Sequence, residues 1–242
     1  MLDRQRNSLG IGRDELLAFR NLAVAAVAAI GLSAGAAQAA VINGSDFTNG
    51  LNAQTIGGID WTSAPGNFNK KTMGGFTGVG ITGGVTGDEI DIGETLTGTS
   101  LTAFAINSIT LGVLFNGPEF GDVNEVAQID INMGGTVFTL TATGDNTAVL
   151  SNPALGTVTN LSPADGSGGG AVWKIEFNPA LFPVTSVSFT ALSGACGEGA
   201  CTNQSDFTLV EMVTSVPEPA ALALLGAGLL GLAAVRRRRA AA

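Results

Sequence analysis

Apolar and polar side chains alternate along Ala127-Gln-Ile-Asp-Ile-Asn-Met-Gly-Gly-Thr-Val-Phe-Thr-Leu-Thr141. A period of two residues is typical of a β-strand with one face buried and the other in solvent. Gly134-Gly135 interrupts the alternation, and a Gly-Gly pair between two such runs predicts a two-residue hairpin turn. The stretch therefore predicts two antiparallel strands, with the apolar residues of each strand, Met133 included, on one face.

The same alternation is found on both sides of this hairpin. It recurs at residues 109–115, 173–177, 187–189 and 207–209. Turns rich in glycine or proline separate the runs, and no long stretch has helical periodicity. About ten short strands separated in this way predict an all-β domain, and we expect a two-sheet β-sandwich of jelly-roll type.

The N-terminus has the three parts of a secretory signal. Four arginines precede an apolar stretch at residues 22–32, which is followed by Ala37-Gln38-Ala39. Small residues at these positions predict cleavage by signal peptidase between Ala39 and Ala40. We therefore expect residues 1–39 to be a signal peptide with a helical apolar core.

The C-terminus combines Pro217, Glu218 and Pro219 with an apolar run at residues 220–235 and a block of four arginines, Arg236, Arg237, Arg238 and Arg239. A helix made from this run satisfies its own backbone hydrogen bonds in lipid, although it is shorter than the roughly 20 residues of a usual span. Both terminal runs are apolar on all faces, unlike the helices of a soluble domain. The arginines predict a stop to transfer and a cytoplasmic C-terminus, so everything before Pro217 lies outside.

This three-part tail resembles that of the PEP-CTERM proteins of exopolysaccharide-producing Gram-negative bacteria. Residues 217–219 stand where that family has its signature tripeptide, residues 220–235 where it has the transmembrane segment, and residues 236–239 where it has the basic cluster. The resemblance implies that an exosortase, a membrane-embedded transpeptidase similar to cysteine proteases, processes the tail near the tripeptide. It also implies an inner-membrane anchor before processing and a cell-surface or extracellular location afterwards. The alternative is an ordinary anchor that is not cleaved.

The ectodomain between these segments, residues 40–215, is strongly acidic, and residues 216–242 form the tail. Three lysines stand against sixteen acidic residues in the ectodomain, for a net charge near −13. This balance argues against binding of nucleic acid or of an anionic membrane through a basic face. The acids either keep the domain soluble or attract divalent cations.

The two cysteines, Cys196 and Cys201, enclose four residues that include two glycines. In an exported protein this pair predicts a disulfide that pins one loop, with a stabilisation of about 2 kcal/mol on the chain-entropy model. A zinc site would need more ligands, and the chain has no histidine.

Oxygen-bearing side chains at Asp122, Asn124 and Glu125 make calcium the one cofactor that the sequence leaves open. The segment lacks the third ligand, the glycine and the terminal glutamate of an EF-hand loop. Solvated turn acids are the simpler interpretation, and no other cofactor is expected.

Catalysis has little support in the composition. The chain has no histidine or tyrosine, and the ectodomain has no arginine, so the commonest general base and several oxyanion stabilisers are missing. A glycoside hydrolase needs only paired carboxylates, for which Glu119 with Glu125, or Asp88 with Asp91, are the candidates. We expect a protein that is not an enzyme.

Two non-enzymatic functions remain. The first is a structural or interaction role with exopolysaccharide at the cell surface or in the extracellular matrix. The second is a carbohydrate-binding module in which Trp61, beside Asp60 and close to a Pro-Gly turn, is an exposed stacking platform. Trp173 lies in an alternating run and is expected in the core.

Overall fold

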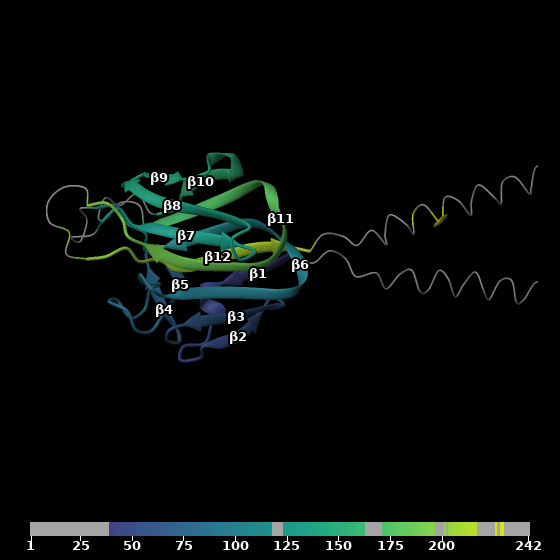
Figure 1. The fold of residues 1–242 in the computed structure, drawn as a ribbon, viewed down its shortest axis with the longest axis horizontal. Coiled ribbons are helices and arrows are strands. Elements are labelled where there is room, and N and C mark those ends of the chain that lie inside the picture. Colours follow the sequence, from purple (N-terminus) through teal and green to yellow (C-terminus); the bar gives the residue numbers. More distant parts are fainter. Residues whose placement is uncertain are drawn as a thin grey trace, which may run out of the picture. The chain divides into compact units, whose positions relative to one another are not determined.

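The computed structural model describes residues 39–117, 123–162, 171–196, 201 and 203–216, together with Gly226, Gly228 and Leu229. The strands belong to one compact unit, Gln38–Pro217 (Figure 1). The predicted signal helix lies outside the described residues, and so does the predicted transmembrane helix except for three helical positions, 226, 228 and 229. Within the described part of the chain, no helix has the length and apolar character needed to span a bilayer.

The described elements are twelve strands and two short 3-10 turns. In chain order they are β1 (Ala39–Asn43), η1 (Gly44–Asp46), β2 (Ala53–Ile56), β3 (Ile59–Ala64), β4 (Phe68–Met73), β5 (Phe76–Ile81), β6 (Thr95–Gly112), β7 (Val126–Ile131), β8 (Thr136–Gly144), β9 (Thr147–Leu150), η3 (Pro153–Leu155), β10 (Gly156–Asn160), β11 (Val172–Leu192) and β12 (Thr208–Ser215).

The strands form one curled antiparallel sheet. Its main order is β4-β5-β12-β6-β11-β7-β8-β9, while β1 pairs with β12, β10 with β11, and β3 with both β2 and β6. Two strands are much longer than the rest: β6 has 18 residues and β11 has 21. They pair with each other at both ends, so the same two strands run through both halves of the sheet.

The β6–β11 ribbon bends in its middle. The register of the pair shifts three times between Glu176 and Ser186, and irregularities of this kind bend a sheet and increase its twist. Pro179 and Pro183 lie in this segment and have no N–H to donate to a ladder. One core cluster draws residues from both halves of the bent sheet, among them Trp173 and Phe189, so the curled sheet encloses its own core.

The all-β prediction is confirmed for the described residues, because every described element longer than three residues in Gln38–Pro217 is a strand. The two-sheet sandwich of jelly-roll type is not confirmed. Since β6 and β11 continue through both halves, the hydrogen bonding is continuous and the sheet closes over the core by bending.

The hairpin predicted at residues 127–141 is confirmed as β7 and β8, which pair from Val126↔Thr141 to Ile131↔Thr136. Its turn is longer than predicted, because Asn132 and Met133 leave the strand with φ values of 56° and 52°. The Asn132 side chain accepts from the Thr185 N–H at 2.8 Å and donates to the Pro183 carbonyl at 2.8 Å, which holds the turn against β11. Met133 is therefore exposed rather than buried.

Candidate functional site

The two ends of the folded domain lie side by side. Strand β1 pairs antiparallel with β12, so that Ala39 is opposite Ser215 and Ala40 opposite Thr214. The predicted signal-peptidase positions, Ala39 and Ala40, are thus the first two residues of β1. Cleavage between them would leave Ala40 as the first residue of β1, which pairs with the C-terminal part of β12.

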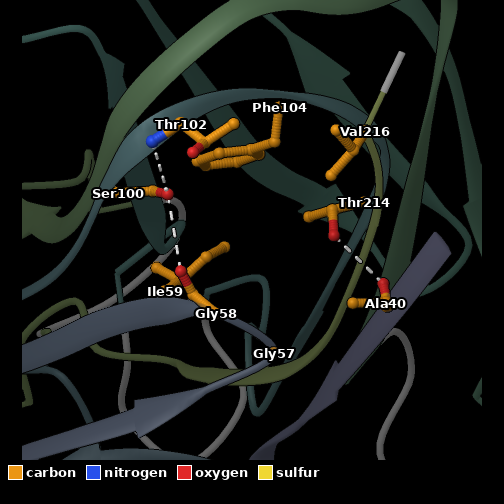
Figure 2. A pocket seen from close by; sticks show the side chains of 9 residues that line it. All are labelled: Ala40, Gly57, Gly58, Ile59, Ser100, Thr102, Phe104, Thr214 and Val216. Carbon is orange, nitrogen blue, oxygen red and sulfur yellow. Dashed lines mark hydrogen bonds between the residues drawn. The ribbon is translucent and has the colours of Figure 1, made fainter. Parts of the chain in front are cut away.

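A cleft opens at this end of the domain (Figure 2). It has a volume of about 440 Å³ and is formed by the start of β1, the Gly57–Gly58 turn between β2 and β3, the bend of β6 from Ser100 to Phe104, and the end of β12 at Val216. Thr214 Oγ1 donates to the Ala40 carbonyl at 3.2 Å, and Ser100 Oγ donates to the Gly58 carbonyl at 3.4 Å. We call this feature the terminal cleft.

The predicted sorting residues follow directly after the terminal cleft in the chain. Pro217, Glu218 and Pro219 and the arginines at 236–239 lie outside the described residues. Val216 is the last described residue before them, and it lines the cleft. The cleft itself could not be found from the sequence, because four segments that are far apart in the chain form it.

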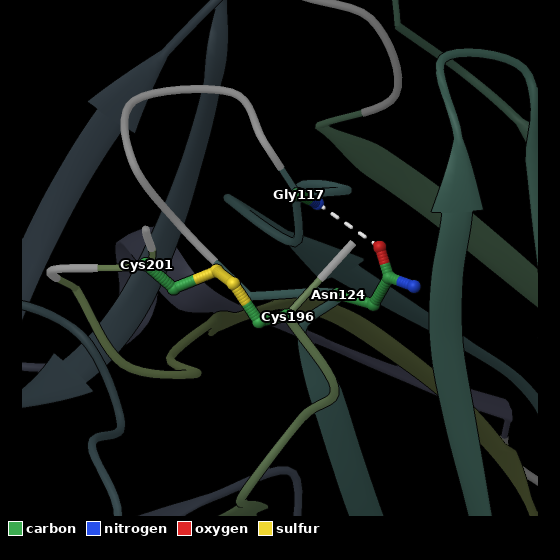
Figure 3. The surroundings of a disulfide bond; sticks show 4 residues. All are labelled: Gly117, Asn124, Cys196 and Cys201. Atoms are coloured by element: carbon green, nitrogen blue, oxygen red, sulfur yellow. Dashed lines mark hydrogen bonds between the residues drawn. A yellow bond between two sulfur atoms is a disulfide. The ribbon is translucent and has the colours of Figure 1, made fainter. Parts of the chain in front are cut away.

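The predicted disulfide is confirmed. Cys196 and Cys201 are bonded, with a Cα–Cα distance of 5.8 Å (Figure 3). The bond joins the segment after β11 to the segment before β12. Nearby, the Asn124 N–H donates to the Ala195 carbonyl at 2.9 Å, so the disulfide-bearing segment is also held to the chain ahead of β7.

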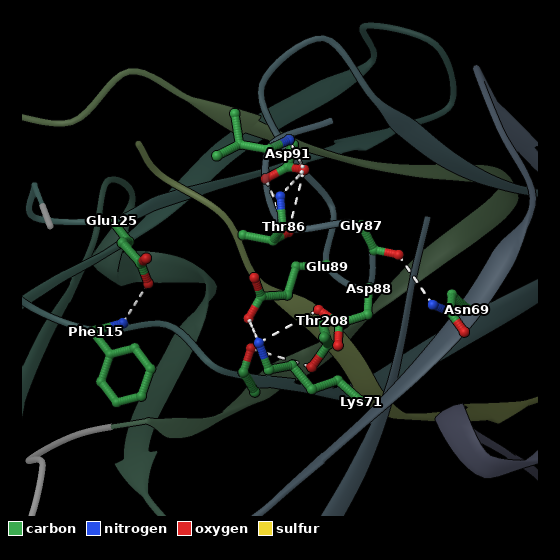
Figure 4. A network of polar contacts seen from close by, with 12 residues as sticks. Asn69, Lys71, Thr86, Gly87, Asp88, Glu89, Asp91, Phe115, Glu125 and Thr208 are labelled. Atoms are coloured by element: carbon green, nitrogen blue, oxygen red, sulfur yellow. Dashed lines mark hydrogen bonds and ion pairs between the residues drawn. The ribbon is translucent and has the colours of Figure 1, made fainter. Parts of the chain in front are cut away.

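The predicted calcium ligands serve the protein's own hydrogen bonds where they are described. Asn124 Oδ1 accepts from the Gly117 N–H at 3.1 Å, and the buried Glu125 carboxylate accepts from the Phe115 N–H (Figures 3 and 4). Asp122 lies outside the described residues. Among the residues that are described, no group of three or more acids or cysteines is arranged to hold a metal ion, and no cofactor is indicated.

A polar network connects β4 to the loop that precedes β6 (Figure 4). Lys71 Nζ lies 2.6 Å from Glu89 Oε1 and 3.4 Å from Asp88 Oδ1. Glu89 is buried, with only 2% of its surface exposed. Burial acts to lower the pKa of Lys71, but the hydrogen bond and charge of Glu89, together with Asp88, outweigh burial and raise that pKa above its ordinary value.

The same loop is organised by Asp91, which is fully buried. Its carboxylate accepts from the N–H groups of Val85 and Thr86 at 2.8 and 3.1 Å, and from Gln204 Nε2 at 3.1 Å. Glu94 accepts from the Asp91 N–H at 3.0 Å. Burial raises the pKa of Glu94, the Asp91 backbone hydrogen bond opposes that rise, and the negative charge of Asp91 adds to it.

The described candidate carboxylates make hydrogen bonds and ion pairs within the domain. Asp88 pairs with Lys71, and Asp91 ties the 84–86 turn to the segment before β12. Glu125 is buried against Phe115, while Glu119 lies outside the described residues.

The prediction that Trp61 is an exposed stacking platform is wrong. Trp61 has an exposed fraction of 0% and packs against Phe47, with ring centroids 5.5 Å apart, and Phe189, at 6.4 Å. It alternates with Asp60, which is exposed and accepts from Thr55 Oγ1 at 2.6 Å. A β-strand places neighbouring side chains on opposite faces, so Asp60 faces solvent because Trp61 faces the core. Trp173 is in the core as predicted.

Comparison with known families gives one match, at the C-terminal end of the chain. The family description "PEP-CTERM protein-sorting motif" matches residues 215–239. The chain is a PEP-CTERM domain-containing protein. The match begins at Ser215, the last residue of β12, so the sorting signal starts where the folded domain ends.

This PEP-CTERM protein is therefore exported and carries the signal by which an exosortase sorts its substrates. The match confirms the resemblance noted for the tripeptide, the apolar run and the arginine block. No curated protein and no solved structure matches the chain significantly. The motif thus indicates that the protein is exported and sorted. It does not cover the strand domain, whose role depends on the surfaces of that domain.

Proposed function

We propose that this protein is a non-catalytic component of the cell surface or extracellular matrix that interacts with exopolysaccharide. In this proposal, its C-terminal helix anchors it in the inner membrane until the exosortase acts near Pro217. The observation that carries the proposal is the start of the sorting motif at Ser215, immediately after the last strand. The strand domain is then the cargo that the tail delivers.

A row of hydroxyl and carboxylate groups on the outer face of the sheet supports the interaction with polysaccharide. Thr62, Thr97, Ser188 and Asp130 are register partners on β3, β6, β11 and β7. A shallow pocket of about 330 Å³ lies over Thr97, Ser188 and Asp130. None of the hydroxyls of Thr62, Thr97 and Ser188 has a hydrogen-bond partner among the described residues. They offer donors and acceptors at the spacing of adjacent strands, about 4.8 Å, to the hydroxyls of a glycan chain.

Removal of these hydroxyls is expected to weaken binding. The double variant Thr97→Val, Ser188→Ala keeps the shape of the row but loses two hydrogen bonds of about 1 kcal/mol each, so its affinity should fall by roughly tenfold or more. The measurement is co-sedimentation of the purified protein with exopolysaccharide from its own host.

The matched control is Thr157→Val, which removes an exposed hydroxyl from β10, outside this row. It should bind as the wild type does. Absence of saturable binding by the wild type, or equal binding by the double variant, would contradict the polysaccharide role and leave the sorting signal untouched.

A further inference from the structure

The end of the domain from which the tail leaves carries exposed apolar side chains. Leu101, on the bend of β6, is fully exposed, and Phe182 in the bulged part of β11 is 56% exposed. Single exposed apolar residues are common, but these two lie close to the same chain end. We call Leu101, Phe182 and Val216, together with the terminal cleft, the tail-side surface.

The register of the sheet places Phe182 and Leu101 at this end. Thr214, Ile106 and Leu181 are successive partners across β12, β6 and β11. Because β11 and β12 both run antiparallel to β6, they run in the same direction. Phe182, which follows Leu181, therefore lies towards the same end of the sheet as the tail, which follows Thr214. Leu101 lies between Ser100 and Thr102, which line the terminal cleft with Val216 (Figure 2).

Residues 39–42, 56–59, 99–106, 178–185 and 212–216 at this end contain no charged residue. The exposed Asp60, which is the register partner of Thr99, and Glu211 border these segments, and Asp130 lies in the neighbouring β7–β8 hairpin. The surrounding domain has a net charge near −13, so chance would place acids here as elsewhere. The acids of the domain thus lie outside these five segments, although some of them border the segments.

Chain length then limits how far this end can be from lipid. Val216 and Ala220, the first residue of the apolar run, are four residues apart, a reach of at most about 14 Å. The headgroup region on one side of a bilayer is roughly 6 Å thick. With the run in the hydrocarbon, the tail-side surface is held at or near the headgroups.

We propose that the tail-side surface is a membrane-contact surface, which seats the domain on the outer leaflet of the inner membrane until the tail is processed. Leu101 and Phe182 enter the interfacial layer, where apolar and aromatic side chains are favourable. The tripeptide is then held at the level where a membrane enzyme works. This inference rests on the membrane anchor of the proposed function, but not on polysaccharide binding.

Tryptophan variants test the contact, because the two native tryptophans are both buried and are the only ones in the chain. The unprocessed protein is purified from an exosortase-deficient host and reconstituted into phosphatidylethanolamine–phosphatidylglycerol vesicles that contain lipid brominated near the headgroup. In Leu101→Trp and Phe182→Trp, the added emission should shift to shorter wavelength and lose most of its intensity. Circular dichroism establishes that each variant is folded.

The control is Val85→Trp. Val85 is 70% exposed, and its loop is tied to the opposite end of β12 through the hydrogen bond from the Ile90 N–H to the Phe207 carbonyl. The eight residues of β12 span roughly 23 Å between the two ends, so this indole should not be quenched. Protein that does not float with the vesicles would overturn the anchor itself. Protein that floats, with Leu101→Trp and Phe182→Trp quenched no more than Val85→Trp, would overturn the contact surface alone.

Discussion

Replacement of Trp61 by alanine is expected to lower the free energy of unfolding by about 3–5 kcal/mol. The indole is fully buried between Phe47 and Phe189, and its removal leaves a large cavity in the larger core cluster. Gly98 on β6 lies so close that a Cβ there would be 3.1 Å from the indole ring, which shows how tightly this side of Trp61 is packed. Urea unfolding, followed by the emission of the buried Trp173, measures the loss.

Trp61→Phe is the matched control. The indole Nε1 of Trp61 is buried without a hydrogen-bond partner among the described residues, so phenylalanine removes an unsatisfied donor and leaves a much smaller cavity. It should lose far less stability than alanine. Normal stability of Trp61→Ala combined with a loss of glycan binding would restore the stacking platform that the burial of Trp61 excludes.

Replacement of Lys71 by methionine is expected to cost about 3 kcal/mol, because it leaves the buried Glu89 carboxylate without its ion-pair partner. The double variant Lys71→Met, Glu89→Leu should recover most of that loss, since it removes the stranded charge as well. Thermal and urea melts of the wild type and the single and double variants measure both effects. Equal stability of Lys71→Met and wild type at pH 7 would show that the pair does not brace the loop.

The pH dependence of the same variants follows from the raised pKa of Lys71. A lysine whose pKa is higher in the folded state adds stability that is fully present below its ordinary pKa of 10.5 and is lost as the pH rises through the raised value. The difference between wild type and Lys71→Met should therefore be constant near neutrality and shrink only in strongly alkaline solution.

Local alternation predicted segments of five of the twelve described strands, β6, β7, β8, β11 and β12. Trp173, Ile175 and Phe177 are buried and Glu176 is exposed, as their period of two indicates. The continuation of β6 and β11 through both halves of the sheet was not predictable in this way. It depends on pairing between residues that are far apart in the chain, such as Leu96 with Phe189 and Leu111 with Trp173.

The sequence contains a signal that predicts the burial of Trp61. Ile59, Trp61 and Ser63 are buried and Asp60, Thr62 and Ala64 are exposed, which is the alternation of a half-buried strand. The Pro65-Gly66 turn that follows is the feature that favoured an exposed position. The sorting tail, by contrast, is a linear signal that does not depend on tertiary structure, and for that reason the family match confirms it at residues 215–239.

The most direct test of the account is the intact mass of the protein recovered from the surface and medium of its native host, compared with that from an exosortase-deficient strain. We expect a mature chain that begins at Ala40 and ends at or near Pro217, and an unprocessed C-terminus when the exosortase is absent. A surface form that still contains Arg236 to Arg239 would contradict processing at the tripeptide and leave an ordinary membrane anchor.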